Sequence, residues 1–294
     1  MLTRRSMMQT SISSLLAAGC WPGAMAAREV ASQNFRFVVC NDLHYLDRNC
    51  TPWFAKMIDK IKSLEPSVVL ILGDMVEHGT SSQHGEIADI LKTLPIPYHI
   101  VVGNHDYASD TDRRSFEQLH PKSINYTFDH AGWQFIGVDT TEGPKSRGVK
   151  VPDATVQWLD QELPKLDKQK PTVLFTHFPM MFGIPFILKD AKPILERLKP
   201  FNLQAVYSGH WHGYTELKSA KVAMTTGKCC SFRRENHDKT PEKGFFVCDV
   251  KVSFMPALRH RILLNFEAQA EGMEADAILK QIIEGTPEQL KEAA

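Results

Sequence analysis

The sequence predicts an α/β fold, and two observations lead to this. Short apolar runs typical of buried strands recur along the chain, and segments with helical spacing separate the first of them. Alternation of strand and helix predicts a largely parallel sheet with right-handed crossovers. One large domain accommodates the pattern, because 294 residues with 43% hydrophobic content require no second core.

Buried strands are predicted at five apolar runs. These runs are residues 35–40, 68–72, 98–102, 172–175 and 203–207. A helix is predicted between the first two strands, because Thr51-Pro52 supplies a cap and a proline at the first helical position, ahead of apolar residues at helical spacing. A second helix is predicted at residues 83–94.

A polar motif directly follows each predicted strand. In chain order the motifs are Asp42-Leu43-His44, Gly73-Asp74, Gly103-Asn104-His105-Asp106, Thr176-His177 and Gly209-His210-Trp211-His212. Each is common alone, since glycine and aspartate are ordinary turn residues, but five motifs after five strands argue against coincidence. Ligands bind beyond the carboxyl ends of parallel strands, so these side chains are expected to converge on one rim. In the last motif, an extended backbone would point both imidazoles to one face.

Together the motifs resemble the calcineurin-like metallophosphoesterase family over residues 34–250. The resemblance implies a four-layer α/β/β/α sandwich of the metallo-dependent phosphatase type, in which two mixed β-sheets are flanked by helices. Candidate strands of the second sheet lie at residues 125–128, 134–139, 214–218, 221–225 and 245–252.

The resemblance also implies a binuclear metal centre. One divalent ion would be held by Asp42, His44, Asp74 and His212, and the other by Asp74, Asn104, His177 and His210. Mixed oxygen and imidazole ligands favour Mn, Fe or Zn. Two such ions convert a shared water to a metal-bound hydroxide and neutralise charge on the phosphoryl oxygens. Purple acid phosphatases carry a tyrosine three residues after the bridging Asp, and Glu77 at that position argues against tyrosinate-bound iron.

Catalytic roles follow from the same resemblance. His105 is implied as the donor of a proton to the leaving oxygen, or as a stabiliser of transition-state charge. Asp106 is suited to orient that imidazole and raise its pKa, with a turn cap as the alternative. Tyr107, Arg113 and Arg114 are candidate substrate-binding residues, because an arginine here is able to hold a second phosphate or a nucleotide; exposed helix arginines are the alternative.

Two further segments are expected near the site. The run 178–186 is unusually apolar for a loop that follows a candidate ligand, which indicates either a wall for a base or lipid chain or ordinary core packing. The polar stretch 233–243 is predicted to be an exposed loop, in which Arg233 and Arg234 are candidates for facing a substrate.

The amino terminus resembles a twin-arginine export signal over residues 1–26. Arg4 and Arg5 precede a mildly apolar stretch, which is shorter than the about 20 apolar residues of a transmembrane helix. We therefore expect the export machinery as a partner, a periplasmic or extracellular location and no transmembrane segment. The alternative is a lipoprotein anchored through Cys20. Residues 27–265 would form the phosphoesterase domain, and residues 266–294 a helical tail.

The charge balance excludes some partners. Loss of residues 1–26 would remove two of 34 basic residues and leave 34 acidic ones. A nearly neutral domain argues against a nucleic-acid polymer or an anionic membrane as obligate partner, because such binding shows a basic excess. Five cysteines would remain after the signal, an odd number that fixes no pairing.

Two functions are consistent with these residues. The leading one is a phosphoesterase that hydrolyses phosphodiester, phosphoanhydride or monoester bonds of a small molecule, because His105 and all metal positions are intact. The alternative is a non-catalytic metal-binding or assembly protein on the same fold. The motifs specify neither the substrate, the native metals nor the oligomeric state.

Overall fold

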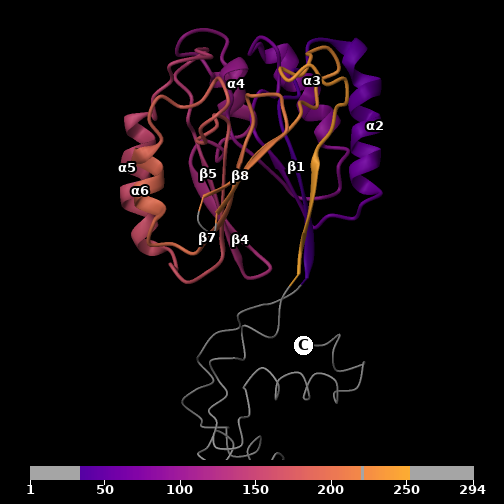
Figure 1. The fold of residues 1–294 in the computed structure, drawn as a ribbon. Coiled ribbons are helices and arrows are strands. Elements are labelled where there is room, and N and C mark those ends of the chain that lie inside the picture. The colour runs from indigo at the N-terminus through magenta and orange to yellow at the C-terminus, as the bar shows by residue number, and fades with distance from the viewer. Residues whose placement is uncertain (1–33, 220–221, 252–294) are drawn as a thin grey trace, which may run out of the picture. The chain divides into compact units, whose positions relative to one another are not determined.

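The computed structural model describes residues 34–219 and 222–251. The predicted signal, the Cys20 alternative and the predicted tail at residues 266–294 lie outside the described residues, as do both ends of the predicted domain 27–265. Within the described part, two mixed β-sheets stack on one another and helices cover their outer faces (Figure 1). This architecture confirms the predicted four-layer α/β/β/α sandwich.

The first sheet has the strand order β10-β1-β2-β3. Its strands are β1 (Phe35–Cys40), β2 (Val68–Ile71), β3 (Tyr98–Ile100) and β10 (Phe246–Val250). The first three run parallel, and β10 pairs antiparallel with β1. The prediction placed residues 245–252 in the second sheet, which is wrong: the register of β10 with β1 is a long-range pairing that local pattern does not encode.

The second sheet has the strand order β4-β5-β6-β7-β9-β8. Its strands are β4 (Tyr126–His130), β5 (Trp133–Val138), β6 (Thr172–Thr176), β7 (Leu203–Ser208), β8 (Thr215–Ser219) and β9 (Val222–Thr226). The four central strands are parallel, and β4 and β8 are antiparallel edges joined to them as hairpins. The five motif-bearing strands therefore belong to two sheets, and the motifs meet across the sandwich rather than on one rim.

Helices α2 (Thr51–Lys62) and α3 (Ser81–Leu91) cover the first sheet, and α5 (Asp153–Glu162) and α6 (Lys192–Leu198) cover the second (Figure 1). The short helix α4 (Arg114–Leu119) and three 3₁₀ turns complete the fold; the turns are η1 (Arg48–Cys50), η2 (Asn104–Asp106) and η3 (Leu163–Lys165). The predicted helix start at Thr51-Pro52 is confirmed, with proline in the first turn, but Thr51 is not the cap: Cys50 occupies that position and no side chain caps the helix. The second predicted helix lies slightly earlier than residues 83–94, because Thr80 caps it by accepting from the Gln83 N–H.

Alternation along β1 explains why its sequence is apolar throughout. Phe37 and Val39 pack between the two sheets, whereas Val38 and Cys40 face the helices α2 and α3. A strand buried on both faces has no solvent side to fill with polar residues. The two layers of core hold the strand ends in place, and hence the loops that carry the motifs.

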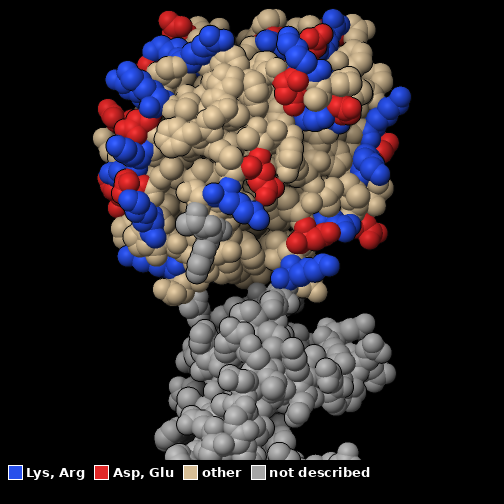
Figure 2. Space-filling view, in the orientation of Figure 1, with Lys and Arg blue, Asp and Glu red and all other residues tan. Residues whose placement is uncertain are grey.

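No helix among residues 34–219 and 222–251 is long and apolar enough to cross a membrane. The five cysteines in this part of the chain form no disulfide. On the face in Figure 2, basic and acidic side chains are interspersed along both flanks.

Candidate metal centre

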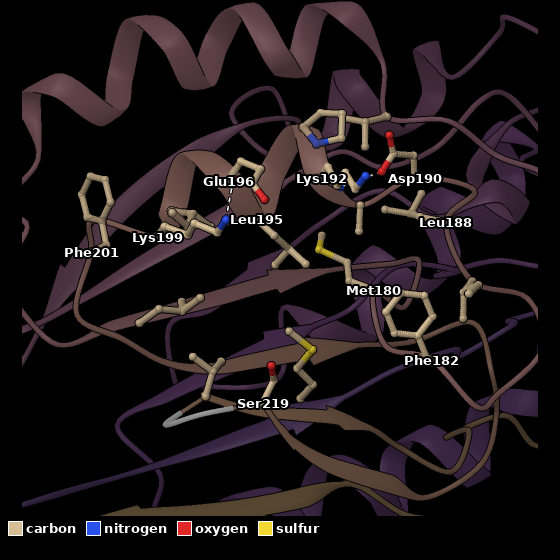
Figure 3. A pocket seen from close by; sticks show the side chains of 18 of the residues that line it. Met180, Phe182, Leu188, Asp190, Lys192, Leu195, Glu196, Lys199, Phe201 and Ser219 are labelled. Atoms are coloured by element: carbon tan, nitrogen blue, oxygen red, sulfur yellow. Dashed lines mark hydrogen bonds and ion pairs between the residues drawn. The ribbon is translucent and has the colours of Figure 1, made fainter.

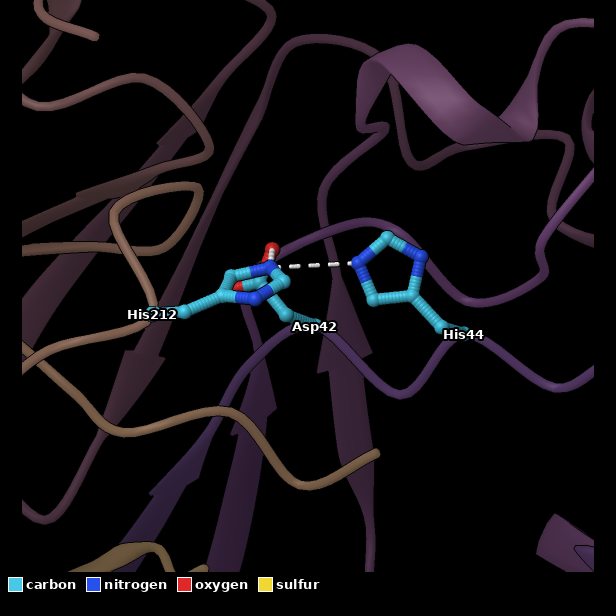
Figure 4. Close-up of side chains that lie close together, drawn as sticks. All are labelled: Asp42, His44 and His212. Atoms are coloured by element: carbon cyan, nitrogen blue, oxygen red, sulfur yellow. Dashed lines mark hydrogen bonds and ion pairs between the residues drawn. The ribbon is translucent and has the colours of Figure 1, made fainter. Parts of the chain in front are cut away.

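The side chains of the five motifs converge at the ends of strands from both sheets. Asp42, His44 and His212 form one group whose candidate ligand atoms all lie within 4.8 Å of one another (Figure 4). His212 Nε2 is 3.3 Å from Asp42 Oδ1 and 3.2 Å from His44 Nε2. Residues that are 168 positions apart in the chain are thus brought into contact.

A second group joins the first through Asp74. It consists of Asp74, His177 and His210. The Nε2 atom of His177 lies 3.4 Å from Asp74 Oδ1, 3.1 Å from Asn104 Oδ1 and 3.2 Å from His210 Nδ1. The other carboxylate oxygen of Asp74, Oδ2, faces His44 Nε2 at 3.5 Å. The Asp74 carboxylate therefore places one oxygen beside each group, as a bridging ligand must.

The backbone around these residues is strained. Five of the candidate ligands have a left-handed backbone without being glycine: Asp42 (φ 54°), His44 (φ 47°), Asp74 (φ 50°), His210 (φ 64°) and His212 (φ 46°). This conformation is unfavourable for residues with a Cβ atom and is typical of functional sites. His210 and His212 thus share a site through positive φ, and the expected extended backbone is wrong.

Glycine is required at position 103, where the loop after β3 passes close to the loop that carries Asp74. A Cβ atom on Gly103 would lie 2.2 Å from the Asp74 backbone nitrogen and from Asp74 Oδ1. The close approach lets the His105 N–H donate to Asp74 Oδ1 at 2.8 Å.

Three of the candidate imidazoles are anchored by a hydrogen bond through the nitrogen that points away from the cluster. The pairs are His177 Nδ1 with Leu72 O (2.8 Å), His210 Nε2 with Ser146 O (2.9 Å) and His212 Nδ1 with Glu235 O (3.3 Å). The outward nitrogen of His44, Nδ1, lies 3.2 Å from Glu77 Oε2 but has no hydrogen-bond partner among the described residues. A histidine that binds a metal usually donates its other N–H to a carboxylate or carbonyl in this way. The inward nitrogens then present lone pairs to the centre.

This donor set fits divalent cations. The inward nitrogens of His44 and His212 face each other at 3.2 Å, as do those of His177 and His210. Such close nitrogens, beside two buried carboxylates and an amide oxygen, favour a positive charge between them, which a proton or a metal cation is able to supply. Oxygen and imidazole donors suit borderline divalent metals. The Asp and His residues are accordingly positioned to bind metal.

Burial and the carboxylates shift the pKa values of the imidazoles in opposite directions. Burial lowers the pKa of His177, but Asp74 and Asp42, with the Leu72 carbonyl, raise it to about 9. Burial likewise lowers the pKa of His212, and Asp42 together with Cys229 raises it to about 10. At His44 and His210 burial prevails, and it lowers the pKa of His210 to about 3. The raised pKa values of His177 and His212 indicate a negative potential beside the two carboxylates, which favours cations.

His105 lies at the edge of this cluster. Its side chain is 27% exposed, whereas that of His44 is 1% exposed. Its Nδ1–H donates to the Glu77 carbonyl oxygen at 2.8 Å, and Nε2 has no hydrogen-bond partner among the described residues. This geometry suits a group that meets the substrate, and the proton-donor role remains a prediction.

Asp106 does not orient His105. Its carboxylate instead accepts backbone N–H groups of Met75 (2.8 Å), Val76 (3.4 Å) and Gly103 (2.8 Å). Burial, aided by the charge of Asp74, raises the pKa of Asp106 to about 8. These contacts favour the turn-cap alternative, because three convergent N–H donors occupy the carboxylate. Glu77 is the residue that orients His105.

The predicted substrate-binding arginines are engaged elsewhere. Arg113 donates to Asp139 (2.5 Å), Glu117 (2.8 Å) and the Tyr107 hydroxyl (2.8 Å). Arg114 has an 80% exposed side chain and pairs with Asp112. These contacts favour the structural alternative, although Tyr107, Arg113 and Arg114 all line one hollow of 720 Å³. Their contact with substrate remains a prediction.

The sequence-based prediction missed Asn41, and it used Glu77 only to exclude a subclass. Asn41 Nδ2 donates to Asp42 Oδ2 at 2.5 Å and so fixes that candidate ligand. The Glu77 carboxylate accepts from Arg234 and lies against His44. The position of Asn41 directly before Asp42 was the only available signal.

The apolar run 178–186 packs in part into the core, and its role as a wall for a base or lipid chain remains a prediction. Phe178 is buried, with its ring 4.1 Å from that of His210. Phe186 is half-buried beside His210 and Trp211, and Arg147 lies over its ring. A larger hollow of 1350 Å³ lies elsewhere, along α6, where Met180, Leu188 and Leu195 line it (Figure 3). None of the candidate ligands lines that hollow.

Comparison with known proteins places this site in a family. The model of calcineurin-like phosphoesterases matches residues 35–214 of the chain, which include all five motifs. The chain is a calcineurin-like phosphoesterase. It is therefore a metal-dependent phosphoric ester hydrolase, as predicted.

Relatives in this family include two kinds of phosphodiesterase. A probable glycerophosphodiester phosphodiesterase of Arcobacter nitrofigilis is 26% identical over 218 residues, which cover 71% of this chain and 77% of that protein. A probable cyclic nucleotide phosphodiesterase of a Synechococcus strain is 28% identical over 185 residues, covering 58% and 71%. A solved dimetal phosphatase from Danio rerio has a TM-score of 0.56 at 16% identity, covering 74% of this chain and 93% of that one, and so shares the fold.

Proposed function

We propose that this calcineurin-like phosphoesterase hydrolyses a phosphodiester of a small molecule at a centre of two divalent cations. The observation that carries the proposal is Asp74, whose two oxygens address separate groups of buried histidines at 3.4 and 3.5 Å. Relatives named as glycerophosphodiester and cyclic nucleotide phosphodiesterases support a diester over a monoester.

The two groups of candidate ligands would each hold one cation. Asp42, His44, Asp74 and His212 would hold one cation, and Asp74, Asn104, His177 and His210 the other. When bound, two such cations lower the pKa of a water and neutralise charge on the phosphoryl oxygens. Manganese, iron and zinc all suit the donor set.

His105 would serve the leaving group. The Glu77 carbonyl holds its Nδ1–H, so Nε2 carries a proton only in the imidazolium form. That proton would pass to the oxygen of the departing alcohol, and general acid catalysis of this kind typically contributes about 10²- to 10⁴-fold in rate. Asp106 would hold the loops on which His105 and Asp74 sit.

Hydrolysis of a nitrophenyl phosphodiester beside the matching monoester, with added Mn²⁺, tests this function. Metal-dependent turnover with a preference for the diester supports the proposal. Faster turnover of the monoester contradicts the diester assignment. Two bound metals with no hydrolysis of either compound would favour the alternative of a metal-binding or assembly protein.

We also propose that the chain is exported through the twin-arginine machinery. The proposal rests on the sequence of residues 1–26. Replacement of both Arg4 and Arg5 by Lys is expected to retain the protein in the cytoplasm in cell fractionation. A variant that is exported as efficiently as the wild type refutes this route, and labelling of Cys20 by a radioactive lipid precursor would support the lipoprotein alternative.

A further inference from the structure

Arg234 reaches the edge of the candidate metal centre from a distant loop. It lies in the segment between β9 and β10, which returns over the centre: the Glu235 carbonyl faces His212 Nδ1 at 3.3 Å, and the His237 N–H donates to the His212 carbonyl at 3.1 Å. The His237 ring stacks on that of His212 with centroids 4.5 Å apart. The loop is therefore built against a candidate ligand.

One edge of the Arg234 guanidinium is held by Glu77. Nε donates to Glu77 Oε2 at 3.0 Å, and Nη2 pairs with Oε1. The same Oε2 atom lies 3.2 Å from His44 Nδ1. A two-point contact between a guanidinium and a carboxylate fixes the plane of the arginine as well as its position. Only Glu77 separates Arg234 from His44.

The other edge of Arg234 is free. Nη1 has no partner among the described residues, and 40% of the side chain is exposed, against 14% for Glu77. Arginine presents five N–H donors in one plane, so the pair with Glu77 leaves donors for a further acceptor. At the edge of a centre that receives a phosphoryl group, those donors match an anionic oxygen.

Arg233 provides an internal contrast. It neighbours Arg234, has a similarly exposed side chain (46%) and carries the same charge, yet it pairs with Asp47 at 3.1 Å. It makes no contact with Glu77 or a candidate ligand among the described residues. Long-range attraction of an anion depends on both arginines alike, whereas direct contact distinguishes them.

We propose that Arg234 is a phosphate-binding residue of this site, held by Glu77 so that its free edge takes a non-bridging oxygen of the substrate's phosphoryl group. The proposal rests on the proposed function. A free and exposed edge alone does not distinguish Arg234, because Arg233 is as exposed and also has free donors among the described residues. What distinguishes Arg234 is its contact with Glu77, which lies against His44.

The test measures binding of inorganic phosphate to the Mn²⁺-loaded chain by calorimetry and, separately, KM and kcat for the nitrophenyl phosphodiester. Arg234→Ala is expected to weaken phosphate binding and to raise KM by about 10- to 100-fold, as loss of a hydrogen bond to a charged group does. Arg234→Lys keeps the charge without the planar fork and should recover part of the loss. Arg233→Ala should bind phosphate like the wild type.

Mn²⁺ affinity, titrated in the same variants, separates this role from a structural one. The proposal expects Arg234→Ala to bind Mn²⁺ like the wild type. Weakened Mn²⁺ binding with unchanged phosphate affinity at saturating Mn²⁺ would show a counter-charge only and overturn it. An equal loss of phosphate affinity in Arg233→Ala would overturn it too. If the wild type bound no Mn²⁺, the proposed function would fail instead.

Discussion

The assignment of Asp106 as a structural residue leads to a quantitative prediction. In Asp106→Ala, the N–H groups of Met75, Val76 and Gly103 lose their acceptor in a fully buried place. Two of these hydrogen bonds are 2.8 Å long and dominate, because the third is 3.4 Å. A buried donor left unpaired costs about 1–3 kcal/mol.

The expected loss is therefore set by two strong hydrogen bonds. Removal of a buried carboxylate also relieves part of its desolvation cost. We expect Asp106→Ala to lower the free energy of unfolding by about 3 kcal/mol, a large share of the about 5–15 kcal/mol that a domain possesses.

Urea unfolding of the metal-free chain measures this loss, with the slope of the transition as a check that the unfolded state is unchanged. Asp112→Ala is the control, because Asp112 pairs with Arg114 at the surface. Little change in the urea midpoint is expected there, because an exposed ion pair contributes little to stability. An Asp106→Ala variant with the urea midpoint of the wild type and a shifted pH profile of activity would refute the structural role and restore the orienting one.

Three further predictions concern single side chains. His105→Ala should lower kcat by about 10²- to 10⁴-fold while Mn²⁺ binding, measured by titration, stays as in the wild type; loss of the metal would instead identify His105 as a ligand. Asn41→Ala removes the 2.5 Å hydrogen bond to Asp42 and should weaken Mn²⁺ binding by about 10- to 100-fold, so unchanged affinity would contradict its positioning role. Burial, with His84 nearby, lowers the pKa of His120 to about 4. Because the unfolded chain binds this proton at higher pH, the free energy of unfolding should fall by up to about 3 kcal/mol as pH drops from about 6.5 to 4. His120→Leu should flatten that part of the curve of unfolding free energy against pH.

Much of the fold followed from local pattern, because strands buried on both faces have continuous apolar sequences. The five strands with their motifs were predicted for this reason. The pairing partner of each strand was not predicted, since β10 pairs with β1 across more than 200 positions of the chain. Arg36 and Asp249, for example, are paired although they are 213 positions apart. Residues 245–252 were therefore assigned to the second sheet, although β10 pairs with β1 in the first.

Short sequence motifs were also enough to identify the candidate ligands, but the backbone conformation of these residues depends on the tertiary structure. The residue types of Asp42, Asp74 and His210 do not predict the left-handed backbone that the structure shows. Non-glycine residues adopt this conformation only when the surrounding structure imposes it. Whether Asp106 capped a turn or oriented His105 depended on N–H donors about 30 positions away, at Met75 and Val76. Tertiary contacts therefore determine both the backbone conformation of the ligands and the role of Asp106.

A two-metal centre bridged by Asp74 is tested most directly by the metal content of the purified chain. After loading with Mn²⁺ and removal of free metal, two ions per chain are expected in the wild type, and at most one in Asp74→Ala and Asp74→Asn, with far-ultraviolet circular dichroism confirming that the variants fold. One ion or none in the wild type, or two in either folded variant, would contradict it.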